Sequence, residues 1–100
     1  MSTQNANGPI AVFDSGLGGL SVRRRLQREM PHEAFLYFGD SANAPYGSRP
    51  TEEIRALTLQ HGEALLAQGA KALVVACNTA TSAAIDSLRR RHPEAIIIGI

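Results

Sequence analysis

Short runs of apolar residues alternate along this chain with longer stretches in which apolar residues recur at helical spacing, and this alternation limits the possible folds most. The apolar runs are PIAVF (9–13), AFLYF (34–38), KALVVA (71–76) and AIIIGI (95–100). Within each run, apolar residues follow one another instead of alternating with polar ones, which is typical of strands covered on both faces. The sequence therefore predicts an α/β fold, an open parallel sheet of four strands in a flavodoxin-like layer, with three helices spread over both faces.

Each of the three helical stretches carries a signal for its beginning or its end. Pro31 ends the first stretch, because proline cannot continue a helix. Thr51 is expected to cap the second stretch at its N-terminus, and Gly69 is expected to end it. The third helix is predicted over roughly 79–91, just before His92 and a proline.

The two ends of the chain differ in character. Residues 1–9 begin with a polar stretch and are expected to form a flexible tail. Residues 10–100 are expected to be the N-terminal part of a larger α/β domain that continues past a strand. The reason is that no covering helix follows the fourth apolar run, and natural domains rarely end within a strand.

Composition argues against several classes of function. Ten basic and nine acidic residues give a net charge of +1, so no overall field attracts nucleic acid or an anionic membrane. The apolar runs are too short to span a bilayer. The single cysteine, Cys77, cannot form an internal disulfide, which suits a reducing cytoplasm. We therefore expect a cytoplasmic protein that requires neither nucleic acid nor a membrane.

Polar residues gather where the first three apolar runs end. In an open parallel sheet, ligands bind beyond the carboxyl ends of the strands, where loops lead into helix N-termini. The residues expected at those ends are Asp14, Ser15, Gly16, Gly39, Asp40, Cys77, Asn78 and Thr79. We predict that Asp14, Asp40 and Cys77 line one concave rim together with Tyr46 from the loop that follows the second run.

Cys77 stands at a strand-to-helix boundary, where a thiol can do chemistry. Unpaired backbone N–H groups and the positive end of the helix dipole favour a thiolate at such a position. Asn78 and Thr79 offer short hydrogen-bonding side chains for a polar ligand. Asp14 or Asp40 can exchange protons with the thiol or bind an ammonium group. The alternative is that Cys77 fills space in the core, which is the usual role of a free cysteine.

Two familiar cofactor sites fit the sequence poorly. The stretch GLGGLS (16–21) resembles a dinucleotide-binding signature, but Ser21 replaces its third glycine. Asp14 would also bring a carboxylate next to the pyrophosphate, which is a repulsive contact. A pyridoxal site needs a lysine at the rim, yet the only lysine, Lys71, begins the third strand about 20 Å from Cys77. No cofactor is therefore expected.

Two further residues have competing interpretations. Tyr46 lies between a proline and a glycine in a long loop, where its ring can fold over a ligand, although turn formation alone explains the neighbouring residues. His61 falls on the inward stripe of the second helix and is interpreted as a packed or interface histidine.

Three separated motifs resemble those of glutamate racemases, in the aspartate/glutamate racemase superfamily: FDSGLGG (13–19), YFGDSANAPYG (37–47) and VVACNTAT (74–81). Their order and spacing agree with that family from residue 10 to residue 100. The resemblance implies a cofactor-independent isomerase that inverts the α-carbon of glutamate with two cysteines. It also implies a role in supplying D-glutamate for peptidoglycan, and thus in cell-wall biogenesis and cell shape. Glutamate is then the small-molecule substrate, and a homodimer is left open.

The resemblance assigns roles position by position. Cys77 resembles the first catalytic acid/base, and Asp14 resembles the carboxylate that assists it. The positions that resemble substrate-holding ones are Asp14, Ser15, Tyr46, Gly47, Asn78 and Thr79. The family's second cysteine precedes a Thr-His pair, and the chain has no such cysteine. The chain therefore carries half of the implied site, and we predict that it is inactive alone.

Other functions remain open at this point. The first alternative is a related enzyme of the same superfamily that acts on aspartate or a similar acid. A nucleotide-binding α/β domain is a second alternative, disfavoured by Asp14 and Ser21. A non-catalytic interaction domain is the third.

Overall fold

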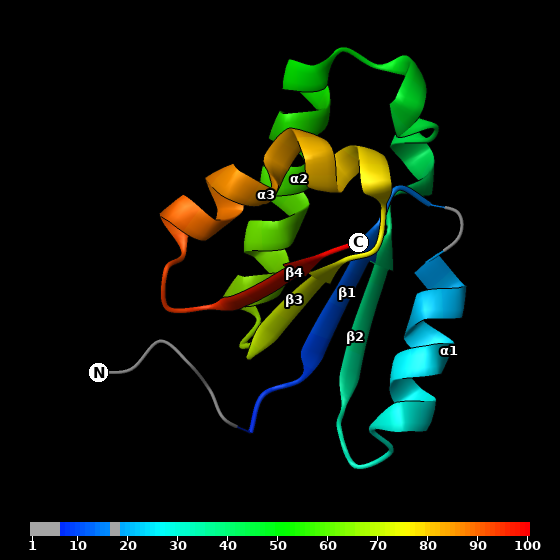
Figure 1. Ribbon diagram of the computed structural model, residues 1–100, viewed down its shortest axis with the longest axis vertical. Helices are drawn as coiled ribbons and strands as arrows, with labels where there is room; N and C mark the ends of the chain where they lie inside the picture. Colours follow the sequence, from blue (N-terminus) through cyan, green and yellow to red (C-terminus); the bar gives the residue numbers. More distant parts are fainter. Residues whose placement is uncertain (1–6, 17–18) are drawn as a thin grey trace.

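A computed structural model describes residues 7–16 and 19–100 of the chain (Figure 1). Its elements in chain order are β1 (Ile10–Asp14), α1 (Gly19–Glu29), β2 (Phe35–Gly39), α2 (Thr51–Ala67), β3 (Ala72–Val75), α3 (Asn78–Arg91) and β4 (Ile96–Gly99). Two one-turn 3-10 helices, Ser41–Asn43 and Tyr46–Ser48, lie in the loop between β2 and α2. The predicted strands and helices are all found. Residues 1–6 of the predicted tail lie outside the described residues.

The strands form one parallel sheet in the order β2-β1-β3-β4. This order is the beginning of the flavodoxin-like arrangement, so the predicted fold class is confirmed. β1 and β3 occupy the centre and are buried along their whole length. β2 and β4 lie at the sides and are more exposed.

Helices cover both faces of the sheet (Figure 1). On one face, Val12 and Val74 pack against α1 through Val22 and Leu26. On the other face, the core beneath α2 and α3 is centred on buried residues such as Ala11, Phe13, Leu73, Val75 and Leu88. Each fully buried leucine or valine side chain contributes about 1.5–3 kcal/mol to folding. The fold thus rests on two cores that share β1 and β3.

On the face of the sheet that α1 covers, the side chains of β4 remain exposed in the described part of the chain. Ile97 faces α3 and is buried, whereas Ile96 and Ile98 point the other way and are 52% and 49% exposed. The prediction that each apolar run is covered on both faces is therefore wrong for β4 within the described residues. The reason is that α1 packs over β1, β2 and β3 only.

The second helix begins differently from the prediction. Thr51 is the first residue of α2, and Pro50 occupies the N-cap position without a side-chain cap. The Pro50 carbonyl accepts the N–H groups of Glu53 and Ile54 at 3.0 and 3.1 Å, so the backbone does what the Thr51 hydroxyl was expected to do. Gly69 follows the end of α2 with φ +96°, as expected of a glycine at that position.

The third helix starts at Asn78, one residue earlier than predicted, directly after Cys77. Across residues 7–16 and 19–100, no helix is long and apolar enough to cross a membrane.

Candidate active site

The carboxyl ends of β1, β2 and β3 meet at one side of the sheet, which we call the carboxyl edge. Asp14 pairs with Gly39 in the sheet register, and the Asp40 N–H donates to the Asp14 carbonyl at 3.1 Å. The Ala76 N–H donates to the Phe13 carbonyl at 2.7 Å, which brings the end of β3 alongside β1. The predicted convergence of Asp14, Asp40 and Cys77 is confirmed.

Cys77 is the residue immediately before α3, with an extended backbone (φ −136°, ψ 120°). Its carbonyl accepts the Thr81 N–H at 2.9 Å, which closes the first turn of the helix. Its thiol is only partly buried and donates to the Ser15 hydroxyl across the edge, with a sulfur–oxygen distance of 3.4 Å. The thiol therefore lies at a helix N-terminus and is accessible to a ligand.

Asp14 is fully buried at the end of β1, and both of its carboxylate oxygens are hydrogen-bonded. Oδ1 accepts the Gly16 N–H, and Oδ2 accepts the Tyr37 hydroxyl. Burial raises the pKa of Tyr37 to about 12, with a further contribution from its bond to Asp14. The phenol therefore stays protonated and keeps donating, so the carboxylate is held in one orientation.

Tyr37 is a site residue that sequence analysis missed. It lies within β2, on the α1 side, and the guanidinium of Arg23 from α1 stands 5.6 Å from the centre of its ring. The available signal was its position two residues before the end of a strand, which puts it on the same face as the residue that ends that strand.

On the α2 side of the carboxyl edge, Asp40 is 3% exposed and accepts several hydrogen bonds. The Tyr46 hydroxyl donates to Oδ2 at 2.6 Å, and the Asn43 amide lies 3.0 Å from each oxygen. His61 Nε2 on α2 lies 3.0 Å from Oδ2, at ion-pair distance but without hydrogen-bond alignment. Burial acts to raise the pKa of Asp40, but these hydrogen bonds and the charge of His61 outweigh it and hold the pKa below its ordinary value.

Tyr46 does not fold over the rim. Its ring is 1% exposed and packs against the core beside Phe13, with ring centres 6.2 Å apart. Burial, together with the bond to Asp40, raises the pKa of its phenol. The idea that the Tyr46 ring closes over a ligand is thus wrong, and only the backbone at this position can face one.

Two glycines at this edge behave in opposite ways. A Cβ on Gly16, whose φ is +120°, would come 2.8 Å from the Ser41 Cα, so only glycine lets the loops after β1 and β2 touch. A Cβ on Gly47 would meet nothing within 4 Å. Gly47 is exposed and borders open space, as a backbone that receives a ligand must.

The remaining predicted residues also lie at the carboxyl edge. Ser15 is half-buried and faces the Cys77 thiol. Asn78 and Thr79 begin α3, the first exposed and the second half-buried. Within the described part of the chain, no group of three or more His, Cys, Asp or Glu side chains is arranged to hold a metal ion.

Known proteins with similar sequences and structures share one activity in their names. A glutamate racemase from Clostridium botulinum (strain Alaska E43 / Type E3) is 57% identical over 94 residues, which are 94% of this chain and 36% of that protein. The crystal structure of glutamate racemase from Thermus thermophilus in complex with β-chloro-D-alanine matches with a TM-score of 0.90 and 47% identity. The matched region covers 96% of this chain and 37% of the Thermus thermophilus chain. The resemblance to glutamate racemases is confirmed.

A second structure extends the match. Glutamate racemase from Francisella tularensis, in complex with D-glutamate, has a TM-score of 0.88 and 38% identity over 93% of this chain. This chain covers 35% of that one, so it spans little more than a third of the length of its racemase relatives. No family model matches the chain.

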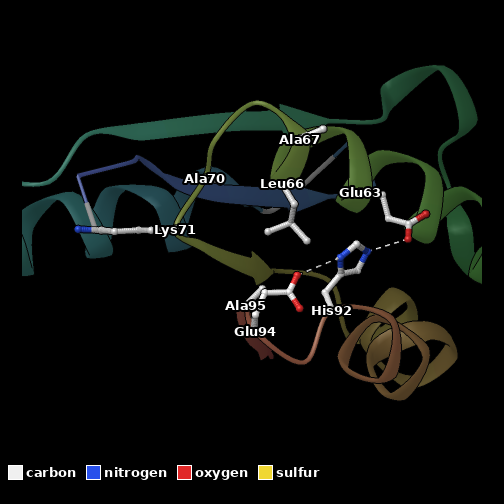
Figure 2. Close-up of a pocket in the computed structure, with 8 residues that line it drawn as sticks. All are labelled: Glu63, Leu66, Ala67, Ala70, Lys71, His92, Glu94 and Ala95. Carbon is white, nitrogen blue, oxygen red and sulfur yellow. Dashed lines mark hydrogen bonds and ion pairs between the residues drawn. The ribbon is translucent and has the colours of Figure 1, made fainter. Parts of the chain in front are cut away.

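The described parts of the three racemase-like motifs meet at the carboxyl edge: the first motif contributes Asp14, the second Asp40 and the third Cys77. A cavity of about 200 Å³ lies elsewhere, between the end of α2 and the segment joining α3 to β4 (Figure 2). It is lined by Glu63, Leu66, Ala67, Ala70, Lys71, His92, Glu94 and Ala95. Because Lys71 precedes β3, this cavity lies at the opposite, amino edge and is separate from the racemase-like site.

Proposed function

We propose that the protein containing this segment interconverts L- and D-glutamate by moving the proton of the α-carbon, without a cofactor. One observation carries the proposal: the Cys77 thiol stands partly exposed at the N-terminus of α3, 3.4 Å from the Ser15 hydroxyl and on the same edge as the buried Asp14. The similar racemases, one of them solved with D-glutamate, support glutamate as the substrate.

Cys77 acts as the acid/base for one face of the substrate. The α-proton of an amino acid is very weakly acidic, so its removal needs a strong base and preorganised hydrogen-bond donors around the developing negative charge. Cys77, directly before the first turn of α3, accepts that proton on its sulfur. Asp14 assists as a fixed carboxylate, and the bonds from Gly16 and Tyr37 hold its position.

The substrate is held by donors from all three loops of the carboxyl edge. Carboxylates accept hydrogen bonds from backbone N–H groups and hydroxyls, and those available are at Tyr46 and Gly47, at Ser15, and at Asn78 and Thr79. Asp14 adds a negative charge that suits the substrate ammonium group. Gly47 supports this arrangement because its backbone borders open space.

Inversion requires a second acid on the opposite face of the substrate when the carbanion forms. Cys77 is the only cysteine of the 100 residues, so the second cysteine lies in another part of the protein. A single thiol removes and returns a proton on one face, which exchanges hydrogen without inverting the centre. Residues 1–100 alone are therefore inactive as a racemase. The complete enzyme works in the cytoplasm, supplies D-glutamate for peptidoglycan, and forms a monomer or a homodimer.

The test uses the full-length protein and measures D-glutamate formed from L-glutamate, with L-aspartate as the competing substrate. We expect turnover of glutamate over aspartate and none from residues 1–100. Iodoacetamide should alkylate Cys77 faster than it alkylates the denatured protein, and glutamate, but not ATP or NAD, should slow the reaction. Faster turnover of L-aspartate than of L-glutamate would show that aspartate is the substrate instead. Racemisation by the purified fragment, or alkylation that glutamate does not slow, would contradict the two-cysteine assignment.

A further inference from the structure

The loop between β2 and α2 is organised around one buried carboxylate, that of Asp40. Besides the bonds from Tyr46 and Asn43, the loop is tied through Arg49, whose Nε donates to the Asn43 carbonyl at 2.8 Å. Arg49 also pairs with Glu53 in the first turn of α2. The turn that holds Tyr46 and Gly47 is thus fastened on the inside by the buried Asp40 and Tyr46 side chains and nearer to solvent by Arg49.

A buried carboxylate needs compensation for its charge, and hydrogen bonds from neutral groups supply only part of it. His61 is the basic side chain that faces Asp40 from α2, with its Nε2 3.0 Å from Oδ2 of Asp40. Its ring packs beside two stacked aromatic rings, 5.7 Å from the centre of Phe13 and 4.7 Å from that of Phe38. These contacts leave its side chain 19% exposed and fix where its Nε2 points.

A series of contacts therefore connects α2 to the loop. His61 on α2 faces Asp40, and Asp40 accepts a hydrogen bond from the Tyr46 hydroxyl. The Tyr46 ring is buried, so what it presents outward is its backbone and that of Gly47. Any shift of the phenol moves this backbone with it.

We propose that Asp40 and His61 form a positioning pair that sets the backbone of Tyr46 and Gly47 for binding the glutamate substrate. The pair does not touch the substrate and acts only through the Tyr46 hydroxyl. The proposal rests on the proposed function, because it assigns the pair to substrate binding at that same site.

The experiment compares His61→Gln with His92→Gln in the full-length protein. His92 is a matched control, since its Nε2 lies 2.7 Å from the Glu63 carboxylate and its side chain is 24% exposed, but it lies at the amino edge. We expect His61→Gln to raise the KM for glutamate about fivefold to tenfold with kcat changed less than about twofold, the size of one lost coupling. His92→Gln should leave both constants unchanged.

A double-mutant cycle with Asp40→Asn separates positioning from a general loss of stability. Asparagine keeps an acceptor for the Tyr46 hydroxyl but removes the charge that His61 faces. In the Asp40→Asn background, His61→Gln should therefore have little further effect on KM. Independent effects on KM, a fall in kcat with KM unchanged, or equal effects of His61→Gln and His92→Gln would overturn the proposal.

Amide hydrogen exchange over residues 41–49 provides a readout that does not depend on activity. The Arg49 N–H donates to the Tyr46 carbonyl at 3.0 Å, and we expect its exchange to accelerate about tenfold in His61→Gln and not in His92→Gln. Unchanged exchange would overturn the positioning role. If the wild-type protein fails to racemise glutamate, the proposed function fails, and the exchange result still decides whether the pair holds the loop.

Discussion

The two edges of the sheet carry similar groups in different surroundings. At the carboxyl edge, Asp40 faces His61 and is 3% exposed. At the amino edge, Glu63 faces His92 and Arg91, and its side chain is 28% exposed. Both edges therefore contain a carboxylate beside a histidine, and the cavity of about 200 Å³ lies at the amino edge.

The difference shows which feature indicates function in this fold. At the amino edge, charges pair near water, which screens them, and such pairs add about 0–1 kcal/mol each. At the carboxyl edge, hydrogen-bond donors satisfy the buried carboxylates: Tyr46 and Asn43 of the same loop for Asp40, and Gly16 and Tyr37 for Asp14. These bonds offset the cost of burial and fix each carboxylate in place. The carboxyl edge is thus distinguished by buried, hydrogen-bonded carboxylates beside Cys77, and the amino edge by its cavity.

The largest expected effect at the carboxyl edge is that of Cys77→Ser in the full-length protein. A hydroxyl is a far weaker acid than a thiol, so the variant lacks a base for the α-proton on that face. We expect racemisation to fall by about 10²–10⁴-fold, measured as D-glutamate formed per second. The melting temperature should change little, because serine keeps the shape of cysteine. Activity within about twofold of wild type would remove Cys77 from the chemistry.

The next effect concerns Tyr37, which donates to Asp14. In Tyr37→Phe, one oxygen of a fully buried carboxylate loses its donor, which should cost about 1–3 kcal/mol of folding free energy in urea titrations. The carboxylate should also lose its fixed orientation, so kcat should fall about tenfold. His92→Gln at the amino edge serves as the control and should change neither value by a comparable amount. Unchanged stability and kcat would show that Asp14 needs no support from Tyr37.

The sequence predicted the fold and the strand ends that carry the candidate site residues, but it did not predict the contacts among those residues. Continuous apolar runs predicted the parallel sheet, and strand ends located Asp14, Asp40 and Cys77 because topology alone brings carboxyl ends together. Tyr37 lies in an apolar run that predicts only a strand, and the position of His61 on the inward stripe of its helix does not predict that it faces Asp40. Such contacts depend on sheet register and on how α2 packs, which periodicity does not encode.

Two glycines of the carboxyl edge sharpen the contrast between structural and substrate-facing backbone. Gly16→Ala should destabilise the protein by about 1–3 kcal/mol, because its φ of +120° disfavours a side chain and Ser41 leaves no room. Gly47→Ala should leave the melting temperature within about 1 °C, because its Cβ meets only open space, and a small change in free energy shifts the melting temperature little. If the substrate contacts this backbone, KM should rise about threefold to tenfold in Gly47→Ala, since a methyl group in a binding site typically costs one to a few kcal/mol. An unchanged KM would place the substrate elsewhere.

The smallest expected effect is on stability at acidic pH, and it concerns the Asp40 carboxylate at the carboxyl edge. The pKa of Asp40 is lowered in the folded protein from its ordinary value of 3.8, so its ionised form favours folding. That stability is present above the unfolded-state pKa and is lost as pH falls from about 4 through the lower folded-state value. In urea titrations between about pH 6 and pH 3, wild type should lose more stability than Asp40→Asn, because the variant has no carboxylate to protonate there. Parallel curves for Asp40→Asn and wild type would show that the ionised Asp40 carboxylate does not stabilise the carboxyl edge.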